Sequence, residues 1–157
     1  QDNIAYYTEF EKEKIVWQEM SNEPAFTLDR RKFYTNQTVY IITGNNLLYI
    51  IGCLNSNISH FYLCHISSSL NEKVNRWIKQ YTEQLHIPRI TAQNQHITKE
   101  LESLVDKILD ITKDEDYLQN DVKQAEVKEY EHQIDQMVYK LYDLTEEEIK
   151  IIENHRK

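Results

Sequence analysis

Residues 67–88, SSSLNEKVNRWIKQYTEQLHIP, decide how the chain divides. Hydroxyl residues end an apolar helical segment, a basic and amide-rich loop follows, and an alternating segment predicts a half-buried strand over residues 77–82. An extended exit containing Pro88 should close this half of the chain. The stretch is rich in cations and short polar side chains, the types that meet phosphates and base edges. These candidates are Ser67, Ser68, Ser69, Asn71, Lys73, Asn75, Arg76 and Lys79.

The acidity of the chain lies entirely beyond this stretch. The whole sequence of 157 residues has a net charge of -8. Residues 1–90 hold 9 Lys/Arg and 9 Asp/Glu and are neutral, whereas residues 91–157 hold 9 and 17, which leaves -8. The global charge therefore does not exclude an anionic partner for the first half, where local patches decide.

Three short segments before residue 44 predict strands. KIVWQEM from Lys14 is β-branched and aromatic, AFTLD follows a turn with Pro24, and TVYIIT over residues 38–43 is bounded by Asn36 and Gly44. Apolar spacing then predicts a mostly buried helix over residues 47–54 and a second helix, with three-and-four spacing, over residues 58–66, with a break at Asn55 or Ser56. Trp17, Trp77 and Tyr81 are expected in the core rather than as stacking platforms.

Beyond residue 91 the periodicity becomes heptad-like. Apolar positions step by four and three over residues 97–111 and again over residues 127–141, with an acidic break at residues 113–116. This pattern predicts an antiparallel helical hairpin. Thr145 and Glu148 form a capping-box signature for a last short helix. The fold class is therefore α+β: a small mixed domain over residues 1–90, then an acidic helical hairpin or spacer over residues 91–157.

The cysteines and the hydropathy favour a cytoplasmic protein. Cys53 and Cys64 lie in apolar helical runs without a CxxC pair, so we expect reduced, buried thiols. No run approaches the roughly 18 consecutive apolar residues of a membrane span. The chain begins at Gln1 without a methionine or a signal-peptide pattern, and is expected to be a fragment of a longer polypeptide.

The order of these segments resembles a known family. The resemblance covers roughly residues 14–90 and is carried by KIVWQEMSNEPAF, Asp29, Tyr34-Thr35-Asn36, TVYIITG, LLYIIGCLNSNISHFY, RWIKQY and LHIPRI. Together they resemble the TaqI-like C-terminal specificity domain, the target-recognition part of type IIG restriction-modification enzymes and adenine-specific DNA methyltransferases. The resemblance implies a mixed α/β domain that docks on double-stranded DNA and reads a short sequence. Base-reading side chains differ among members, so none can be transferred by motif.

A second polar patch precedes the strand over residues 38–43. Arginine can bind guanine in a bidentate way, asparagine and glutamine can bind adenine, and a loop can enter a groove. The same residues would also suit a solvated turn, because short basic runs are common on surfaces. The candidates of this patch are Arg30, Arg31, Lys32, Tyr34, Asn36 and Gln37.

Catalytic motifs are missing from the sequence. An adenine methyltransferase of this type needs an Asn-Pro-Pro-Tyr-like tetrad and a Gly-containing cofactor loop, and neither occurs. The Glu-x-Lys triplets at residues 126–128 and 148–150 fall on expected helices and suit solvated charge pairs. His60 and Cys64 are four residues apart, but two ligands do not make a zinc site, so a helix-packing role is preferred. We expect no cofactor in this chain, and S-adenosylmethionine in the parent enzyme.

Two functions from different classes remain. The first is a non-catalytic DNA recognition domain of a bacterial restriction-modification enzyme, whose acidic hairpin faces away from DNA and packs on a methyltransferase module or a partner subunit. The second is a protein-interaction module whose heptad helices recruit a partner helix. The sequence motifs do not separate these two functions.

Overall fold

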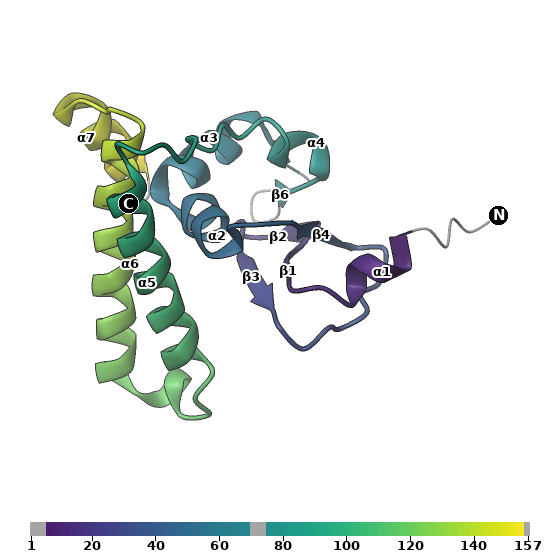
Figure 1. The fold of residues 1–157 in the computed structure, drawn as a ribbon. Coiled ribbons are helices and arrows are strands. Elements are labelled where there is room, and N and C mark those ends of the chain that lie inside the picture. Colours follow the sequence, from purple (N-terminus) through teal and green to yellow (C-terminus); the bar gives the residue numbers. More distant parts are fainter. Residues whose placement is uncertain (1–5, 70–74, 156–157) are drawn as a thin grey trace. The chain divides into compact units, whose positions relative to one another are not determined.

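The computed structural model describes residues 6–69 and 75–155 (Figure 1). It contains helices and small antiparallel sheets, so the predicted α+β class is confirmed. The chain forms two compact units, and each is built from two separate stretches of sequence. The first comprises residues 1–47 and 62–85, and the second comprises residues 48–61 and 86–157. The boundary expected at residue 90 stays a prediction.

The first unit is built on a three-stranded sheet in which a central strand, β1, has an antiparallel neighbour on each side. Its strands are β1 (Lys14–Gln18), β3 (Phe26–Asp29) and β4 (Val39–Thr43), and a short helix, α1 (Tyr7–Phe10), precedes them. All three strands were predicted from their β-branched and aromatic residues. Alternation along β1 buries Ile15 and Trp17 toward one face of the sheet. The opposite face carries Val16 and Gln18.

A second small sheet was not predicted from the sequence, which indicated a loop here. Its strands are β2 (Met20–Ser21), β6 (Asn75–Arg76) and β5 (Ser68–Ser69), with β6 in the middle. The two tryptophans join this sheet to the first one. Trp17 Nε1 donates to the carbonyl oxygen of Trp77 at 2.7 Å, and Trp77 Nε1 donates to that of Ser21 at 3.1 Å. Both rings are buried, so their predicted core role is confirmed.

The strand expected over residues 77–82 is wrong, because a short helix, α4 (Lys79–Thr82), occupies most of this segment. The carbonyl oxygen of Ile78 accepts hydrogen bonds from the backbone N–H groups of Tyr81 and Thr82 at 3.0 and 3.3 Å. Trp77 and Thr82 are buried while the residues between them are not, a spacing that does not fit alternation. Tyr81 is half-buried, so its predicted core position is met only in part.

The second unit contains α2 (Leu47–Asn55) and the first half of α3 (Asn57–Ile66). The predicted break between these helices lies at Ser56, whose hydroxyl donates to the carbonyl oxygen of Cys53 at 2.7 Å. The α3 N-terminus is capped from another helix. The backbone N–H and side-chain Nδ2 of Asn57 each donate to a different carboxylate oxygen of buried Asp135, both at 2.7 Å.

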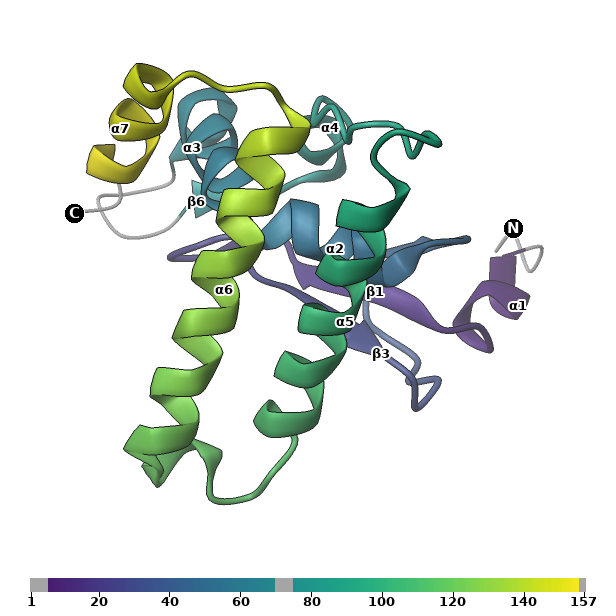
Figure 2. The ribbon, with the colours of Figure 1, turned by 60° about the vertical axis from the view of Figure 1, so that its left-hand side comes forward.

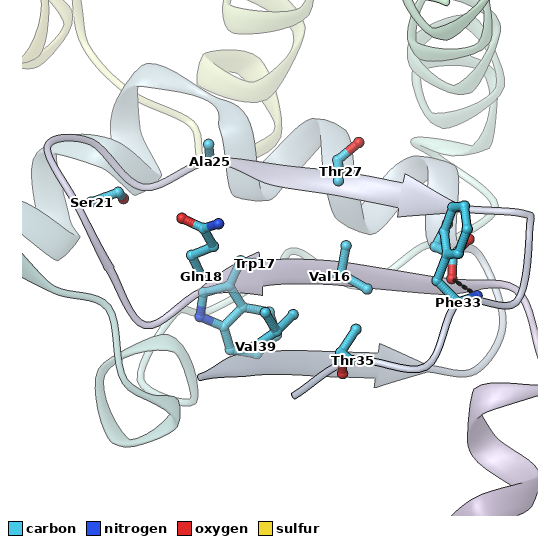
Figure 3. Close-up of a pocket in the computed structure, with 10 residues that line it drawn as sticks. Val16, Trp17, Gln18, Ser21, Ala25, Thr27, Phe33, Thr35 and Val39 are labelled. Carbon is cyan, nitrogen blue, oxygen red and sulfur yellow. Dashed lines mark hydrogen bonds between the residues drawn. The ribbon is translucent and has the colours of Figure 1, made fainter. Parts of the chain in front are cut away.

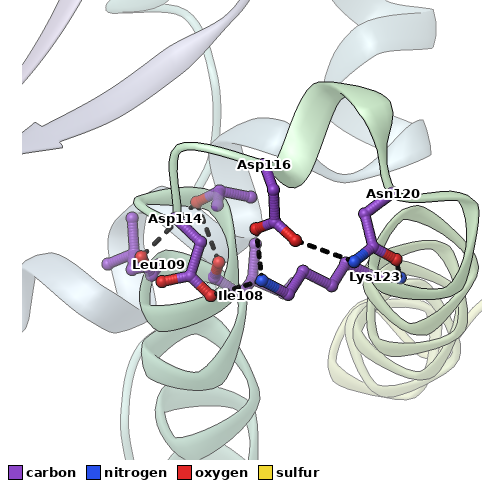
Figure 4. Close-up of polar contacts among 7 residues, drawn as sticks. Ile108, Leu109, Asp114, Asp116, Asn120 and Lys123 are labelled. Carbon is purple, nitrogen blue, oxygen red and sulfur yellow. Dashed lines mark hydrogen bonds and ion pairs between the residues drawn. The ribbon is translucent and has the colours of Figure 1, made fainter.

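The predicted helical hairpin is confirmed. Helices α5 (Gln95–Thr112) and α6 (Asp121–Leu141) run side by side, joined by a polar turn that includes a 3-10 segment, η2 (Tyr117–Gln119) (Figure 2). At this turn Lys123 Nζ contacts Asp114 Oδ2 at 2.8 Å and also bonds Asp116, and both carboxylates raise its pKa (Figure 4). Asn120 caps α6 by accepting from the backbone N–H of Lys123 at 3.2 Å.

The last helix, α7 (Glu146–His155), begins with the predicted capping box. Thr145 N–H donates to Glu148 Oε2 at 2.8 Å, and Glu148 N–H returns a bond to Thr145 Oγ1 at 3.3 Å. The exit over residues 85–90 has no helix or strand, as predicted, and Tyr49 holds it by donating from its hydroxyl to the Pro88 carbonyl oxygen at 2.8 Å.

Two further observations concern the predicted thiols and the apolar helices. Neither cysteine forms a disulfide; Cys53 is buried as predicted and Cys64 is half-buried. Burial raises the pKa of the Cys53 thiol to about 12. Among the described residues no single helix is long and apolar enough to cross a membrane. Helices α2 and α3 reach that length and apolar composition only when they are taken together, and a 63° bend separates them.

Candidate nucleic-acid interface

Three of the five described cations proposed to contact DNA are already in ion pairs within the chain. Arg30 Nε lies 2.7 Å from Glu13 Oε1, and Lys79 Nζ lies 3.2 Å from Glu83 Oε1. Arg76 binds Glu19 Oε1 through Nη2 at 2.5 Å and Nε at 3.2 Å, and this hydrogen bonding raises the pKa of the Arg76 guanidinium. A phosphate would have to replace these carboxylates, so part of the charge counted in the sequence is already compensated.

Arg31 and Lys32 differ from the other cations. Both are exposed, and neither forms an ion pair with any residue in the described ranges 6–69 and 75–155. They lie in the loop over residues 30–38 that connects β3 to β4. Lys32 has a φ of 61°, in the left-handed region, so the chain turns sharply at this residue. These two side chains form the uncompensated positive charge of the loop.

A buried ion pair fixes the start of this loop. Lys14 Nζ lies 2.5 Å from Asp29 Oδ2 and also donates to the Phe10 carbonyl oxygen at 2.9 Å. Asp29 also accepts from the backbone N–H of Arg31 at 2.7 Å and of Phe33 at 2.8 Å. Burial by itself would raise the pKa of Asp29, but these hydrogen bonds outweigh it and leave the pKa below its usual value. The carboxylate therefore holds the backbone on both sides of Lys32.

The open face of the first sheet carries an apolar hollow of about 430 Å³ (Figure 3). Val16 and Thr27 lie on its floor, Phe33 stands at one end, and Ser21 lies at the other. The remaining lining residues come from β1, β3, β4 and the connecting segments: Trp17, Gln18, Ala25, Asp29, Thr35 and Val39. The loop over residues 30–38 thus contributes to a surface that the sequence analysis did not predict.

Several of the predicted polar residues that the structure describes lie near one or the other end of β1. Pairing of Lys14 with Asp29 puts Arg31 and Lys32 near the first end of β1. The loop then returns, because Val39 pairs with Gln18 and Glu19 N–H donates to the Thr38 carbonyl oxygen at 2.9 Å. Asn36 and Gln37 therefore come to the same end of β1 as β2 and its partner Arg76. With a rise of about 3.3 Å per residue, the two ends of β1 lie about 13 Å apart.

The other side chains of the loop have internal contacts. The Tyr34 hydroxyl donates to Glu11 Oε1 at 2.6 Å, which raises the pKa of the phenol, and its ring stacks on Phe10 at a centroid distance of 5.1 Å. Asn36 Oδ1 accepts from the Thr38 backbone N–H at 3.1 Å. Gln37 is exposed in the following turn.

The second sheet brings together four of the proposed DNA-contacting residues: Ser68 and Ser69 on one strand, and Asn75 and Arg76 on the next. Ser68 pairs with Arg76 and Ser69 pairs with Asn75. Ser67 Oγ is shielded from solvent and has no hydrogen-bond partner among the described residues, so a contact from this hydroxyl would require its surroundings to open. Asn71 and Lys73 lie outside the described residues. DNA contact by all of these residues stays a prediction.

Sequence reasoning missed Phe33, Lys14 and Asp29. Phe33 follows the basic run directly, and this position was its only signal in the sequence, because its exposure is known only from the structure. Lys14 and Asp29 are separated by 15 positions and become partners only through strand pairing.

The Glu-x-Lys triplets lie on α6 and α7 as predicted, and Glu148 acts in the capping box. His60 and Cys64 lie on α3, and no cluster of three potential metal ligands occurs in the described ranges.

The described residues thus form helices and small antiparallel sheets, with exposed cations in the loop over residues 30–38 and a hollow on one sheet face. Residues 1–87 match the family model of the TaqI-like C-terminal specificity domain. This match covers more than half of the chain, and the chain therefore belongs to the family of TaqI-like C-terminal specificity domains, as predicted. The family is defined by specificity rather than by catalysis. No curated protein matches the chain.

Proposed function

We propose that this chain is the DNA sequence-recognition domain of a bacterial restriction-modification enzyme of type IIG. It positions a methyltransferase or endonuclease on its target and performs no chemistry itself. Membership of the specificity-domain family carries this proposal. The structure supports it with two polar groups near opposite ends of β1, one basic and one rich in hydroxyl and amide groups.

The spacing of the two groups suits a duplex. Base pairs rise by about 3.4 Å along each strand of DNA. The separation of about 13 Å along β1 therefore corresponds to about four base pairs. We propose that Arg31 and Lys32 contact phosphates, while Asn36, Gln37 and Asn75 supply donors and acceptors to base edges. Arg76 can join them by exchanging Glu19 for a phosphate or a guanine.

The acidic hairpin has a separate role in this proposal. Phosphates repel its charge, so α5 and α6 face away from DNA and pack on the methyltransferase module of the same polypeptide or on a partner subunit. S-adenosylmethionine would be bound by that module, since the sequence of this chain has no Gly-containing cofactor loop. The complete enzyme would act in the cytoplasm.

A protein-interaction role has one observation in its favour. The heptad positions cannot recruit a helix as they stand, because Leu104, Val127 and Ile134 are already buried. Leu118 and Val122, however, are 76% and 77% exposed beside the hairpin turn. A partner with an apolar, basic surface would suit this tip, which also carries Asp114 and Asp116.

A binding measurement on the whole chain tests the main proposal. Fluorescent mixed-sequence duplex DNA should bind weakly at low salt and less tightly as salt rises, because counterions are released on binding. Changing Arg31→Glu and Lys32→Glu together should reduce affinity and the salt slope. The matched control is Lys99→Glu with Lys128→Glu on the hairpin, which should change neither. Equal loss in both double variants would contradict the placement of the interface, and absence of DNA binding would contradict the function.

A further inference from the structure

Phe33 is an exposed aromatic side chain held on a fixed backbone. Its exposed fraction is 58%, although it is a large apolar residue. It stands at one end of the hollow (Figure 3). Its backbone N–H donates to Asp29 Oδ2 at 2.8 Å, so the position of its Cα is tied to the first sheet. Single exposed apolar residues are common on protein surfaces, so the backbone and the charges around Phe33 decide whether it meets a partner.

The turn that presents Phe33 is organised before any partner binds. Asp29 accepts from the N–H groups of Arg31 and Phe33, and its own position is fixed by Lys14, which is fully buried. Between these two N–H groups Lys32 adopts a left-handed conformation, which reverses the chain direction. Because the turn is already ordered, binding a partner costs little conformational entropy, and more of the contact energy appears as affinity.

The charge around Phe33 indicates which partner it meets. Arg31 and Lys32 are exposed within two residues of it and form no ion pair with the rest of the described chain. The exposed apolar residues of the hairpin tip, Leu118 and Val122, lie instead among carboxylates. A phenylalanine preceded by two uncompensated cations matches polyanionic DNA, whereas the hairpin tip does not.

We propose that Phe33 acts as a wedge that inserts between neighbouring base pairs of the bound duplex, while Arg31 and Lys32 contact adjacent phosphates. Apolar side chains used in this way unstack one base step and kink the duplex, and the cost of unstacking is offset by added contacts. Lys14 and Asp29 are the positioning residues of the wedge. This inference rests on the proposed DNA-recognition function and assigns a mechanical part of it to one side chain.

Two duplexes that differ at a single step test the wedge with the whole chain. Both span about two helical turns of mixed sequence. One is fully paired, and the other carries a central thymine–thymine mismatch, which is already weakly stacked. A wedge has less unstacking to do at the mismatch, so the chain should bind the mismatched duplex about tenfold more tightly or better. Phe33→Ala should remove this preference, and Phe33→Trp should keep it.

The controls separate the wedge from the general interface. Arg31→Ala with Lys32→Ala should weaken binding to both duplexes by the same factor, and Leu118→Ala should alter neither affinity. Circular dichroism of each variant checks that the fold is kept. Equal binding of the two duplexes by the unmodified chain, or an unchanged preference in Phe33→Ala, would overturn the wedge and leave DNA recognition standing. Failure to bind either duplex at low salt would overturn both proposals.

Discussion

Lys14 and Asp29 face each other across the antiparallel pairing of β1 and β3, and their charged groups meet at 2.5 Å although both side chains are buried. The carboxylate of Asp29 also accepts two backbone N–H groups of the loop that carries Arg31 and Phe33. One buried pair therefore links the α1 carbonyl of Phe10, the sheet and the proposed DNA-contacting loop.

Breaking this pair should be costly, because removal of one partner leaves the other charge buried and uncompensated. Asp29→Ala and Lys14→Met should each lower the free energy of unfolding by about 3–5 kcal/mol. Urea denaturation followed by tryptophan fluorescence would measure the loss, since Trp17 lies on β1. The matched control is Arg30→Ala, whose exposed pair with Glu13 should contribute about 1 kcal/mol or less. Similar losses in all three variants would contradict this account.

The same carboxylate predicts a dependence on acid pH. The pKa of Asp29 is lower in the folded state than the usual value of about 4 in an unfolded chain. Its contribution to stability is therefore present above about pH 4 and is lost as the pH falls through the folded-state pKa. Urea midpoints measured between about pH 5 and pH 2 should fall more steeply for the unmodified chain than for Asp29→Asn. Parallel curves for the two proteins would exclude Asp29 as the cause.

Gly52 allows α2 to approach α5 closely. A Cβ added there would lie 2.5 Å from Leu101 Cδ2 and 3.0 Å from Val105 Cγ2. Gly52→Ala gains about 1 kcal/mol of helix propensity but should cost about 1–3 kcal/mol by overpacking, so a net loss of stability is expected. Leu101→Ala opens space beside the new methyl group. The loss of unfolding free energy in the double variant should therefore be smaller than the sum of the losses in the two single variants. Strictly additive losses in thermal or urea unfolding would contradict direct contact between the two side chains.

Asp135 on α6 should be important for the start of α3. Its carboxylate accepts from both the backbone and the side-chain nitrogen of Asn57, so Asp135→Ala removes a helix cap and two hydrogen bonds at a partly buried helix start. A loss of about 2 kcal/mol or more in the free energy of unfolding is expected. Glu129→Ala, an exposed change on the same helix, should cost only a few tenths. Equal effects would show that the α3 cap contributes little.

Local sequence patterns predicted most elements of this fold correctly. β-branched runs gave the right strands at Lys14–Gln18 and Val39–Thr43, and heptad spacing predicted the hairpin of α5 and α6. The segment over residues 77–82 was misassigned because its alternation was read from side-chain type alone. Trp77 is buried, and it donates to the carbonyl oxygen of Ser21 and accepts from Trp17, two residues that lie far from it in sequence.

In the candidate site too, the sequence predicted which residues are polar but not which of them are already paired within the chain. The sequence identified Arg31, Lys32 and Asn36 as polar candidates, and these are exposed as expected. It could not distinguish them from Arg30 and Arg76, whose carboxylate partners lie 17 and 57 residues away. Electrostatic compensation depends on distance in space, so a count of charges along the chain overestimates the available positive charge.

The sequence by itself determined the α+β class, the hairpin, the capping box of α7 and the family, because each depends on local periodicity, on neighbouring residues or on the order of short motifs. Only the tertiary structure decided which cations remain uncompensated, that Phe33 is presented beside them, and that Lys14 meets Asp29 in the core. These relationships are set by strand register and chain reversal, which bring together residues that no local pattern connects.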